Sequence, residues 1–306
     1  FVFNRLGESF RAVWFVNYMI RPDYRRGPLA MRLLGAFHRP PYSLEIAFGL
    51  NPRVAPIYQR LGWRLLKPIH RHFAVLPDTT ERMKELVRLA HPDCEAHRAE
   101  SLASRFTLKT TARSSVPFAG ELPQSWDLCD WSKMASRSIG AARDTDYLTW
   151  RYLKHPGFKY HFLAVPDGPR TGLAVWRLET IRLRTSHGTE DVDKVGRLVE
   201  FLPASRNNAA QLLSIFWNQL RATGALGADF FGYHGENNTW LEEFGFHDVE
   251  TDPVGQMIPG RFQPLEARPG TMLGAVRAQD DLSLGSEEFD GIWYWTKSDA
   301  DQDRPN

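Results

Sequence analysis

The chain of 306 residues is predicted to be a mixed α/β protein made of two tandem units, each with a twisted mixed central sheet flanked by helices. Two observations predict this class. Apolar, β-branched runs alternate along the chain with segments of helical spacing, as in proteins whose helices cover a sheet. The order of these segments is the same in both halves, and in each half a short helix is followed by glycine and an aromatic residue, at Gly62-Trp63 and at Gly245-Phe246.

Composition narrows the class of protein. With 42% hydrophobic and 24% charged residues, the chain can bury two substantial cores. A net charge of +2 gives no bulk attraction for nucleic acid. No stretch approaches the roughly 20 apolar residues of a membrane span, and the first residues lack the apolar core of a signal peptide. We therefore expect no membrane partner. Cys94 and Cys129 have no metal-ligand spacing, so we expect no metal cluster, and two cysteines in unrelated contexts fit a cytoplasmic protein.

The first half predicts strand, turn, helix, strand, short helix and strand in that order. An apolar run over 13–20 has the composition of a buried strand, which Arg-Pro-Asp ends before a basic Arg-Arg-Gly turn at 25–27. A strand over 42–48, a short helix after Asn51 and a strand-like stretch over 64–76 complete the unit. Between the strands at 13–20 and 42–48, the spacing of the apolar residues predicts a helix, with Leu29, Leu33, Leu34 and Phe37 on one face.

The basic turn before this helix suits a phosphorylated ligand. Backbone N–H groups at a helix start are unpaired and carry partial positive charge, so with Arg25 and Arg26 they favour a pyrophosphate. Taken alone, such a turn is more often only solvated.

These segments resemble the GCN5-related N-acetyltransferases, whose cofactor is acetyl-CoA. The family's pyrophosphate loop, Arg/Gln-x-x-Gly-x-Gly/Ala, is met at Arg25 and Ala30, whereas Pro28 replaces the central glycine and removes one N–H. Gly27, one position earlier, lets the loop approach the ligand in its stead. Downstream, the family's Asn, small residue and Tyr are matched as well. The resemblance implies cofactor contacts at Ile20, Arg25, Arg26, Gly27, Leu29, Ala30, Asn51, Ala55 and Tyr58.

The resemblance also implies roles in acyl transfer. Tyr58 would protonate the leaving thiolate, and a backbone N–H near Ile20 would stabilise the oxyanion. Packing is the other reading of Tyr58. Glu45 and Glu200, each inside an apolar strand, are candidate general bases, although a strand glutamate more often faces solvent, and Asn17 is a candidate for orienting the acceptor. A chain of water molecules could replace any single base.

The second half repeats the frame without the cofactor turn. We expect helices over 126–139 and 144–154, the latter capped by Asp144, and strands over 160–165 and 172–183 joined by a turn. The turn at 202–208 lacks the arginine-glycine pattern, and Leu241 stands where the first half has Tyr58, so this unit should wall the acceptor pocket instead. The remaining predicted elements are a strand at 194–202, a helix at 208–223, a strand at 228–234, a short helix at 238–244 and a last strand pair near 257–258 and 292–296.

Residues 146–156 resemble a segment of tandem acetyltransferase-like proteins from bacterial surface-polysaccharide pathways. Trp150, Arg151 and Tyr152 could bind a sugar ring, and a core role fits them equally well. The acidic end, 298–306, is either a solvated tail or a segment that folds back across the site. The expected domains are a cofactor-binding unit at 1–77, lacking the family's first strand and two helices, a connector at 78–123 that begins with a helix, and a degenerate unit at 124–306.

The leading functional prediction is an acetyl-CoA-dependent N-acetyltransferase acting on a small polar amine such as an amino sugar or nucleotide sugar. One alternative is an aminoacyltransferase of the peptidoglycan-bridge type, which the retained Arg25 and Ala30 disfavour. The other is a non-catalytic scaffold that binds acyl-CoA, which Pro28 keeps open. The sequence leaves open whether the protein is a monomer or a homodimer.

Overall fold

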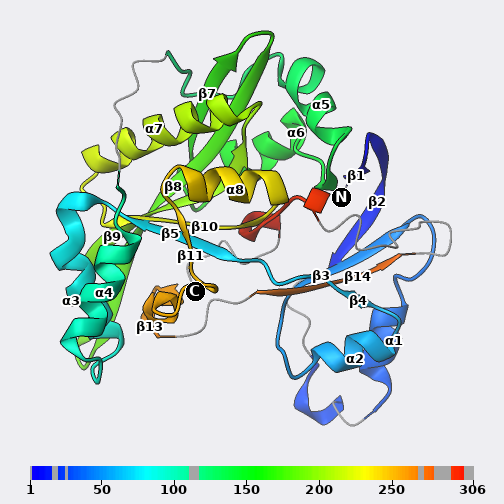
Figure 1. Cartoon of the computed structure of the whole chain (residues 1–306). Coiled ribbons are helices and arrows are strands. Elements are labelled where there is room, and N and C mark those ends of the chain that lie inside the picture. Colours follow the sequence, from blue (N-terminus) through cyan, green and yellow to red (C-terminus); the bar gives the residue numbers. More distant parts are fainter. Residues whose placement is uncertain are drawn as a thin grey trace.

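Two mixed sheets, each flanked by helices, form the protein in the computed structural model (Figure 1). The predicted mixed α/β class is therefore confirmed. Within the described part of the chain, no helix combines the length and the apolar character needed to cross a membrane. The structure describes residues 2–15, 20–24, 27–109, 117–267, 272–278 and 291–299.

The two large sheets share one strand order. In spatial order the first sheet contains β4 (Arg64–Leu65), β14 (Leu273–Ala278), β3 (Leu44–Leu50), β2 (Glu8–Phe15), β1 (Val2–Arg5) and β6 (Ile139–Ala141). The second contains β11 (His247–Asp248), β5 (Arg71–Val75), β10 (Gly227–Tyr233), β9 (Gly188–Leu202), β8 (Arg170–Thr185) and β7 (His161–Asp167), with β15 (Trp295–Thr296) beside β10. A small hairpin joins β12 (Arg261–Phe262) to β13 (Leu265–Glu266).

Position by position, the second sheet repeats the first. One parallel pair lies at the centre of each, β2 with β3 and β9 with β10, and every other pairing in the two series is antiparallel. Val13 pairs with Glu45, and Gly196 pairs with Ala228. Both pairs span 32 positions, and each member of the first is 183 positions before its counterpart in the second. This constant spacing makes residues 183 positions apart structurally equivalent across the central strands.

The sheets exchange one strand each. β5 follows β4 along the chain but pairs with β10 and β11 in the second sheet, whereas β14 comes late in the chain and lies between β3 and β4 in the first. In Figure 1 the cyan β5 accordingly lies with the yellow strands and the orange β14 with the blue ones. The stretch 64–76, expected to close the first unit, is thus divided between the sheets. Reciprocal exchange makes each sheet depend on the other's segment for completion.

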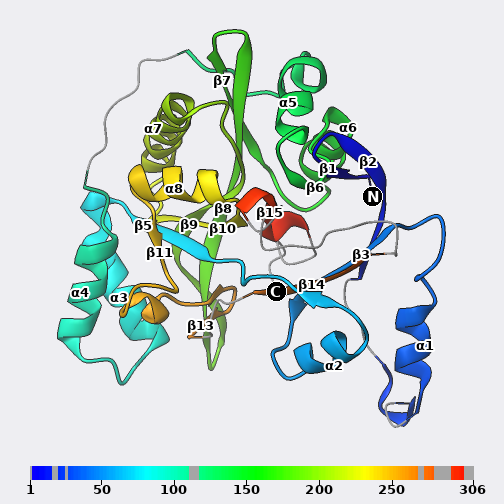
Figure 2. The same ribbon diagram turned by 45° about the vertical axis from the view of Figure 1, so that its right-hand side comes forward.

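The helices cover both sheets. Those of the first sheet are α1 (Leu29–Gly35) and α2 (Ala55–Arg60), and those near the second are α3 (Thr80–Ala90), α4 (Ala96–Phe106), α5 (Ser132–Ala135), α6 (Thr145–Leu148), α7 (Arg206–Ala222) and α8 (Gly235–Glu243). Alternate residues of β5 face opposite layers, because Phe73 packs with α3 and α4 while Ala74 packs with α7 and α8. Figure 2 shows these two helix pairs on opposite sides of the sheet. Shorter helical turns are Pro22–Tyr24, Pro77–Thr79, Trp126–Trp131, Thr149–Leu153, Gly255–Met257 and Lys297–Asp299.

Four expectations about the elements need correction. The connector at 92–123 contains α4, whose buried stripe consists of two alanines and two large apolar residues, Ala99, Leu102, Ala103 and Phe106. The helix expected to reach 139 ends at 135, and β6 begins four residues later. The expected last strand pair is absent from the described residues, because 255–257 forms a helical turn and β15 pairs with β10. β14 was not anticipated at all.

Candidate active site

The expected cofactor residues belong to segments that meet at one end of the first sheet. The ladder between β2 and β3 runs from Ala12 and Leu44 to Phe15 and Ala47, and β3 continues to Leu50. Helix α1 follows β2, and α2 follows β3. Ligands of open α/β sheets bind at the carboxyl ends of adjacent parallel strands. This end of the sheet is therefore the first place to look for a cofactor.

Several residues expected to bind cofactor or acceptor cannot be placed. Asn17, Arg25 and Arg26 lie outside the described residues, as does the side chain of Ala30. Of the neighbouring residues, Ile20 is half-buried and Gly27 is exposed.

Helix α1 forms where its spacing predicts, but little of it is buried. Among its described side chains only Leu34 lies in the core, while Leu29, Leu33 and nearby Phe37 are 46%, 41% and 38% exposed. The outer strands of this sheet, β1 and β6, have four and three residues, whereas their counterparts β8 and β7 have sixteen and seven and provide a wide surface for α7. Pro28 is the N-cap of α1, and no side chain accepts a hydrogen bond there. A helix of seven residues has a small dipole, so any attraction for pyrophosphate would rest on the arginines.

Tyr58 lies on α2 as a core residue. Its side chain is 5% exposed and packs with Ala47 of β3, Trp63 and Ala275 of β14. The ring meets Trp63 edge to face, with 5.1 Å between ring centroids. Asn51, before the helix, is exposed, and its side-chain oxygen accepts a hydrogen bond from the backbone N–H of Arg53. The packing role of Tyr58 is therefore seen directly, and its role as an acid stays a prediction.

Glu45 lies on the same helix-covered face of β3 and is buried rather than facing solvent. Its carboxylate accepts a hydrogen bond from Arg277 of β14, and its other oxygen is 3.6 Å from His38 Nδ1. The Arg277 guanidinium lies 5.2 Å from the Trp63 ring centroid and donates to Leu34 O at 3.2 Å. Arg277 and Trp63 thus connect Glu45 with Tyr58, two of the predicted catalytic side chains of the first unit. The sequence holds no signal for the Arg277 contact, because 232 positions separate it from Glu45.

The corresponding end of the second parallel pair is filled by the chain itself. Its ladder ends at Leu198 and Phe230, the equivalents of Phe15 and Ala47. Beyond it, residues 294–299, which we call the plug, lie between β9 and β10. The plug pairs through Trp295 with Tyr233 of β10, and Ser298 Oγ donates to Val199 O of β9 at 3.2 Å. Of the two readings of 298–306, folding back fits residues 298 and 299, and the rest lie outside the described residues.

Glu200 holds the plug through a fully buried polar cluster. Its carboxylate accepts hydrogen bonds from Arg143 Nε at 2.9 Å, from the Tyr152 hydroxyl at 2.5 Å and from the Tyr294 hydroxyl at 2.7 Å. Arg143 also donates to Asp299 Oδ2 at 2.6 Å. These contacts show a structural role for Glu200, and its predicted role as a base stays untested. Counted along the sequence, the residue equivalent to Glu200 is Asn17.

Burial sets the protonation of this cluster. It raises the pKa of Glu200, although Arg143 partly opposes the shift. Burial also raises the pKa values of Tyr152 and Tyr294 well above 10, so both hydroxyls stay protonated and can donate to the carboxylate. For Arg143, burial disfavours the charged form, but the charges of Asp299 and Glu200 outweigh it and raise the pKa well above its usual value. The arginine is therefore a permanent cation between two carboxylates.

The three residues expected to bind a sugar do not form one surface. Trp150 is 57% exposed, whereas Tyr152 is buried with its hydroxyl bonded inside the protein. Arg151 is half-buried and donates to Ser298 O at 3.0 Å. Of the three, only Trp150 has a largely solvent-exposed side chain. Asp144 caps α6 as predicted, accepting from the Tyr147 N–H at 2.8 Å.

Comparison with known proteins finds likenesses among solved structures. No family model matches the chain, and no curated protein does. A solved structure, a GCN5-related N-acetyltransferase from Kribbella flavida, is similar at 11% identity and a TM-score of 0.47. The match covers 91% of this chain and 55% of that one, so this chain spans about half the length of the solved protein. A likeness of this size does not assign the chain to a family.

Proposed function

We propose that the protein is an acetyl-CoA-dependent N-acetyltransferase that modifies a small polar amine, with amino sugars and nucleotide sugars as the acceptor class. The cofactor is proposed to bind at the end of the β2–β3 pair in the first sheet. The second sheet is proposed to contribute framework and part of the acceptor wall, where Trp150 offers an exposed ring.

One observation carries the proposal: the two parallel pairs are equivalent, yet only the second is filled by a described segment of the chain. In the second sheet the plug is held by the Arg143–Glu200 cluster. In the first, no described strand pairs with β3 on the side of β2 beyond Ala47. Along the sequence, Arg25 and Ala30 fall between β2 and β3, and Tyr58 lies on α2, which follows β3. Sequence motif and topology therefore favour the same end of the same sheet.

The proposed reaction uses few protein groups. The neutral amine nitrogen attacks the thioester carbon, a C–N bond forms, and the C–S bond breaks as the tetrahedral intermediate collapses. Tyr58 donates its hydroxyl proton to the departing thiolate and regains one from solvent, while the proton of the new ammonium leaves through water. Glu45 is proposed to act through Arg277, which holds Trp63 and so the ring of Tyr58 in place.

The experiment is calorimetric titration of the purified full chain with acetyl-CoA, followed by turnover assays on a panel of amines. We expect saturable binding that Arg25→Ala abolishes. Tyr58→Phe should keep binding and slow turnover by about 100-fold, the usual loss for one general acid. Arg206→Ala is the matched control, because it removes an arginine at the start of α7, the corresponding helix of the second sheet. It should leave affinity unchanged.

The outcomes separate the alternatives. No heat with either acetyl-CoA or CoA would overturn the proposal. Binding without turnover on any amine would favour the acyl-CoA scaffold, and turnover with aminoacyl-tRNA alone would favour the aminoacyltransferase. A loss of affinity in Arg206→Ala equal to that in Arg25→Ala would place the cofactor in the second sheet.

A further inference from the structure

Five potential metal ligands gather on one face of the second sheet, far apart in sequence. We call them the donor cluster: His70, His72, Glu242, Asp248 and Glu250. Two triads within it have their ligand atoms within 4.8 Å of one another, and the triads share Asp248. The sequence alone predicted no metal cluster, because 170 or more positions separate the histidines from the carboxylates.

Strand register explains the gathering. Asp248 of β11 pairs directly with His72 of β5 in an antiparallel ladder. The next bond along, from Val249 N to Arg71 O at 2.8 Å, puts Glu250 across from His70. Side chains two positions apart on a strand share a face, so four donors form a two-by-two patch there.

Helix α8 adds the fifth donor above this patch. Glu242 lies in the last turn of the helix, and its Oε1 is 3.3 Å from His72 Nε2. His70 Nδ1 is 2.6 Å from Asp248 Oδ2. The other oxygen of Asp248 is already engaged, because it accepts from the backbone N–H of Glu250 at 2.8 Å and of Thr251 at 3.3 Å. These bonds aim Oδ2 at the histidine, as outer hydrogen bonds orient metal-binding carboxylates.

The first sheet shows which side chains the fold accepts at the positions of His72 and Asp248. By the shared register, the equivalents of His72 and Asp248 are Ala275 and Leu65, and both belong to or pack against the core around Tyr58. A fold that accepts alanine and leucine here has no architectural need for ionisable groups. His72 is nevertheless 1% exposed, and its Nδ1 has no hydrogen-bond partner among the described residues. Burying such a group is costly unless something compensates for it.

We propose that the donor cluster binds one divalent transition-metal ion, with Zn²⁺ as the representative ion. The triad of His70, Asp248 and Glu250 supplies the ligands, water completes the coordination, and His72 and Glu242 border the site. Imidazole nitrogen with carboxylate oxygen is a ligand set that Zn²⁺ accepts in a tetrahedral arrangement. With bonds of about 2.0–2.1 Å, neighbouring ligand atoms around tetrahedral zinc lie about 3.3 Å apart. Side-chain shifts of about 1 Å therefore close triads that already lie within 4.8 Å.

The ion would join the exchanged strand to the sheet that receives it. His72 lies on β5 and His70 directly precedes it, and β5 reaches the second sheet from the segment that follows β4, whereas β11 is a strand of the second sheet and α8 packs beside it. Metal bound only by the folded arrangement stabilises it by mass action. This proposal is independent of acetyl transfer, since the cluster and the β2–β3 end lie in different sheets.

The test uses the full chain without an affinity tag, dialysed against a chelator and titrated with ZnCl₂ by calorimetry. We expect one equivalent to bind with a Kd of about 1 μM or tighter, and the midpoint of thermal unfolding to rise with added Zn²⁺. Co²⁺ in place of Zn²⁺ should give the intense visible absorption of a four-coordinate site. Mg²⁺, which prefers oxygen ligands in octahedral geometry, should not compete.

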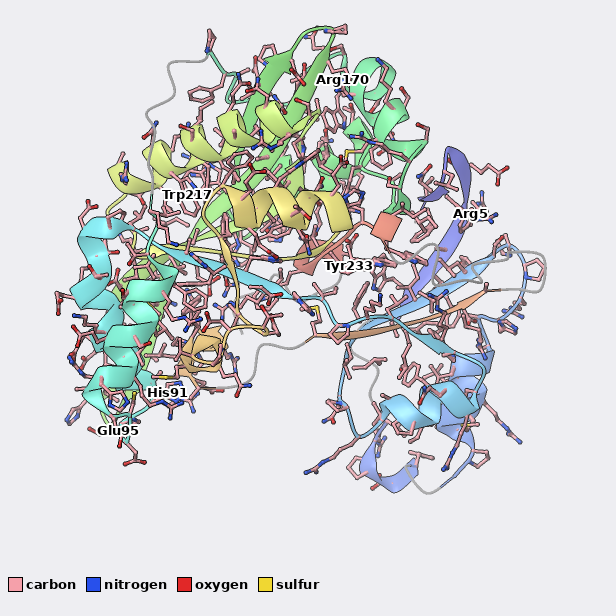
Figure 3. All side chains as sticks on the ribbon, in the orientation of Figure 1. Arg5, His91, Glu95, Arg170, Trp217 and Tyr233 are labelled. Carbon is pink, nitrogen blue, oxygen red and sulfur yellow. The ribbon has the colours of Figure 1, made fainter. Side chains whose placement is uncertain are left out.

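Matched histidine variants locate the ion. His70→Gln, at a half-exposed position, should weaken Zn²⁺ binding by about 100-fold and remove the Co²⁺ absorption. His97→Gln is the control, because His97 also lies beside a carboxylate, 3.5 Å from Glu95, and Figure 3 shows Glu95 at the outer end of the α3–α4 hairpin. It should leave binding unchanged. Asp248→Asn keeps the hydrogen bonds of Oδ1 and provides a second loss-of-binding variant.

Three results would overturn the proposal. One is no saturable uptake of Zn²⁺ or Co²⁺. Another is uptake that His70→Gln and Asp248→Asn leave unchanged, which would mean an adventitious surface ion only. The third is Mg²⁺ competing as well as Co²⁺, which would assign the cluster to a different class of cation.

Discussion

The two sheets have the same strand order and register, but they differ at the end of their central parallel pair. In the second sheet that end is closed by the plug, which is held in place where Arg143, Tyr152 and Tyr294 of the plug donate to the buried Glu200. In the first sheet, Tyr58 and Glu45 lie on the helix-covered face beside Arg277 and Trp63. The comparison teaches that one backbone frame can place its polar groups either in a closed core or next to a candidate ligand site. Substitutions at equivalent positions of the two sheets test that contrast.

Arg143→Ala should cause the largest loss of stability. It leaves the carboxylates of Glu200 and Asp299 buried without their cation, and breaking such a pair costs about 3–5 kcal/mol. Arg277→Ala, the matched change in the first sheet, affects one carboxylate at a more accessible arginine and should cost about 1–2 kcal/mol. Urea denaturation at pH 7 measures both. Equal losses would contradict the distinction between a closed core and a candidate site.

His234 should make the stability of the second sheet depend on pH. Burial lowers its pKa to about 4, while an unfolded histidine titrates near 6.5. Between these values the unfolded chain binds a proton that the folded chain does not. The contribution of His234 to the free energy of unfolding should therefore be complete above pH 6.5. It should fall by about 3 kcal/mol as the pH drops towards 4.

His234→Asn provides the control for that dependence. Asn51 is the residue 183 positions earlier, so the substitution installs the first sheet's side chain at the same place. Asparagine is also a good N-cap and can still accept from the Asn237 N–H, as the imidazole does at the start of α8. The difference between the two unfolding curves across pH 4–6.5 isolates the histidine. Parallel curves would show that His234 is not held neutral.

Sequence patterns predicted many of the helices and strands and the repeat, but they did not predict which distant segments pair or contact one another in the sheets. Strands and helices with strong periodicity were predicted, and Asp144 was recognised as a cap. Helix α4 was missed because alanines carry half of its buried stripe. The strand exchange, the contact of the plug with Arg143 and the Arg277 contact join segments separated by more than 100 positions. Local sequence patterns cannot predict such long-range contacts.

Gly245→Ala and Gly62→Ala compare the equivalent turns after α8 and α2. Both glycines have positive φ, +112° and +80°, so alanine is strained at either and should cost about 1–2 kcal/mol. At Gly245 the added Cβ would lie 2.3 Å from Leu108 Cδ2, whereas at Gly62 nothing lies within 4 Å. The second-sheet variant should lose about 1 kcal/mol more, through repacking of Leu108. Thermal unfolding of the pair measures the difference, and a larger loss at Gly62 would reverse the assignment of the tighter turn.

Helix caps give the smallest effect and the finest comparison of the two sheets. Ser205 begins α7, and its hydroxyl accepts from the Asn208 N–H at 3.2 Å, whereas Val54 begins α2 without any side-chain acceptor. Ser205→Ala should therefore cost about 1 kcal/mol, and Val54→Ala should stay within about 0.5 kcal/mol of the parent chain. Urea denaturation resolves the difference. Equal losses in the two variants would contradict the difference between the two helix starts.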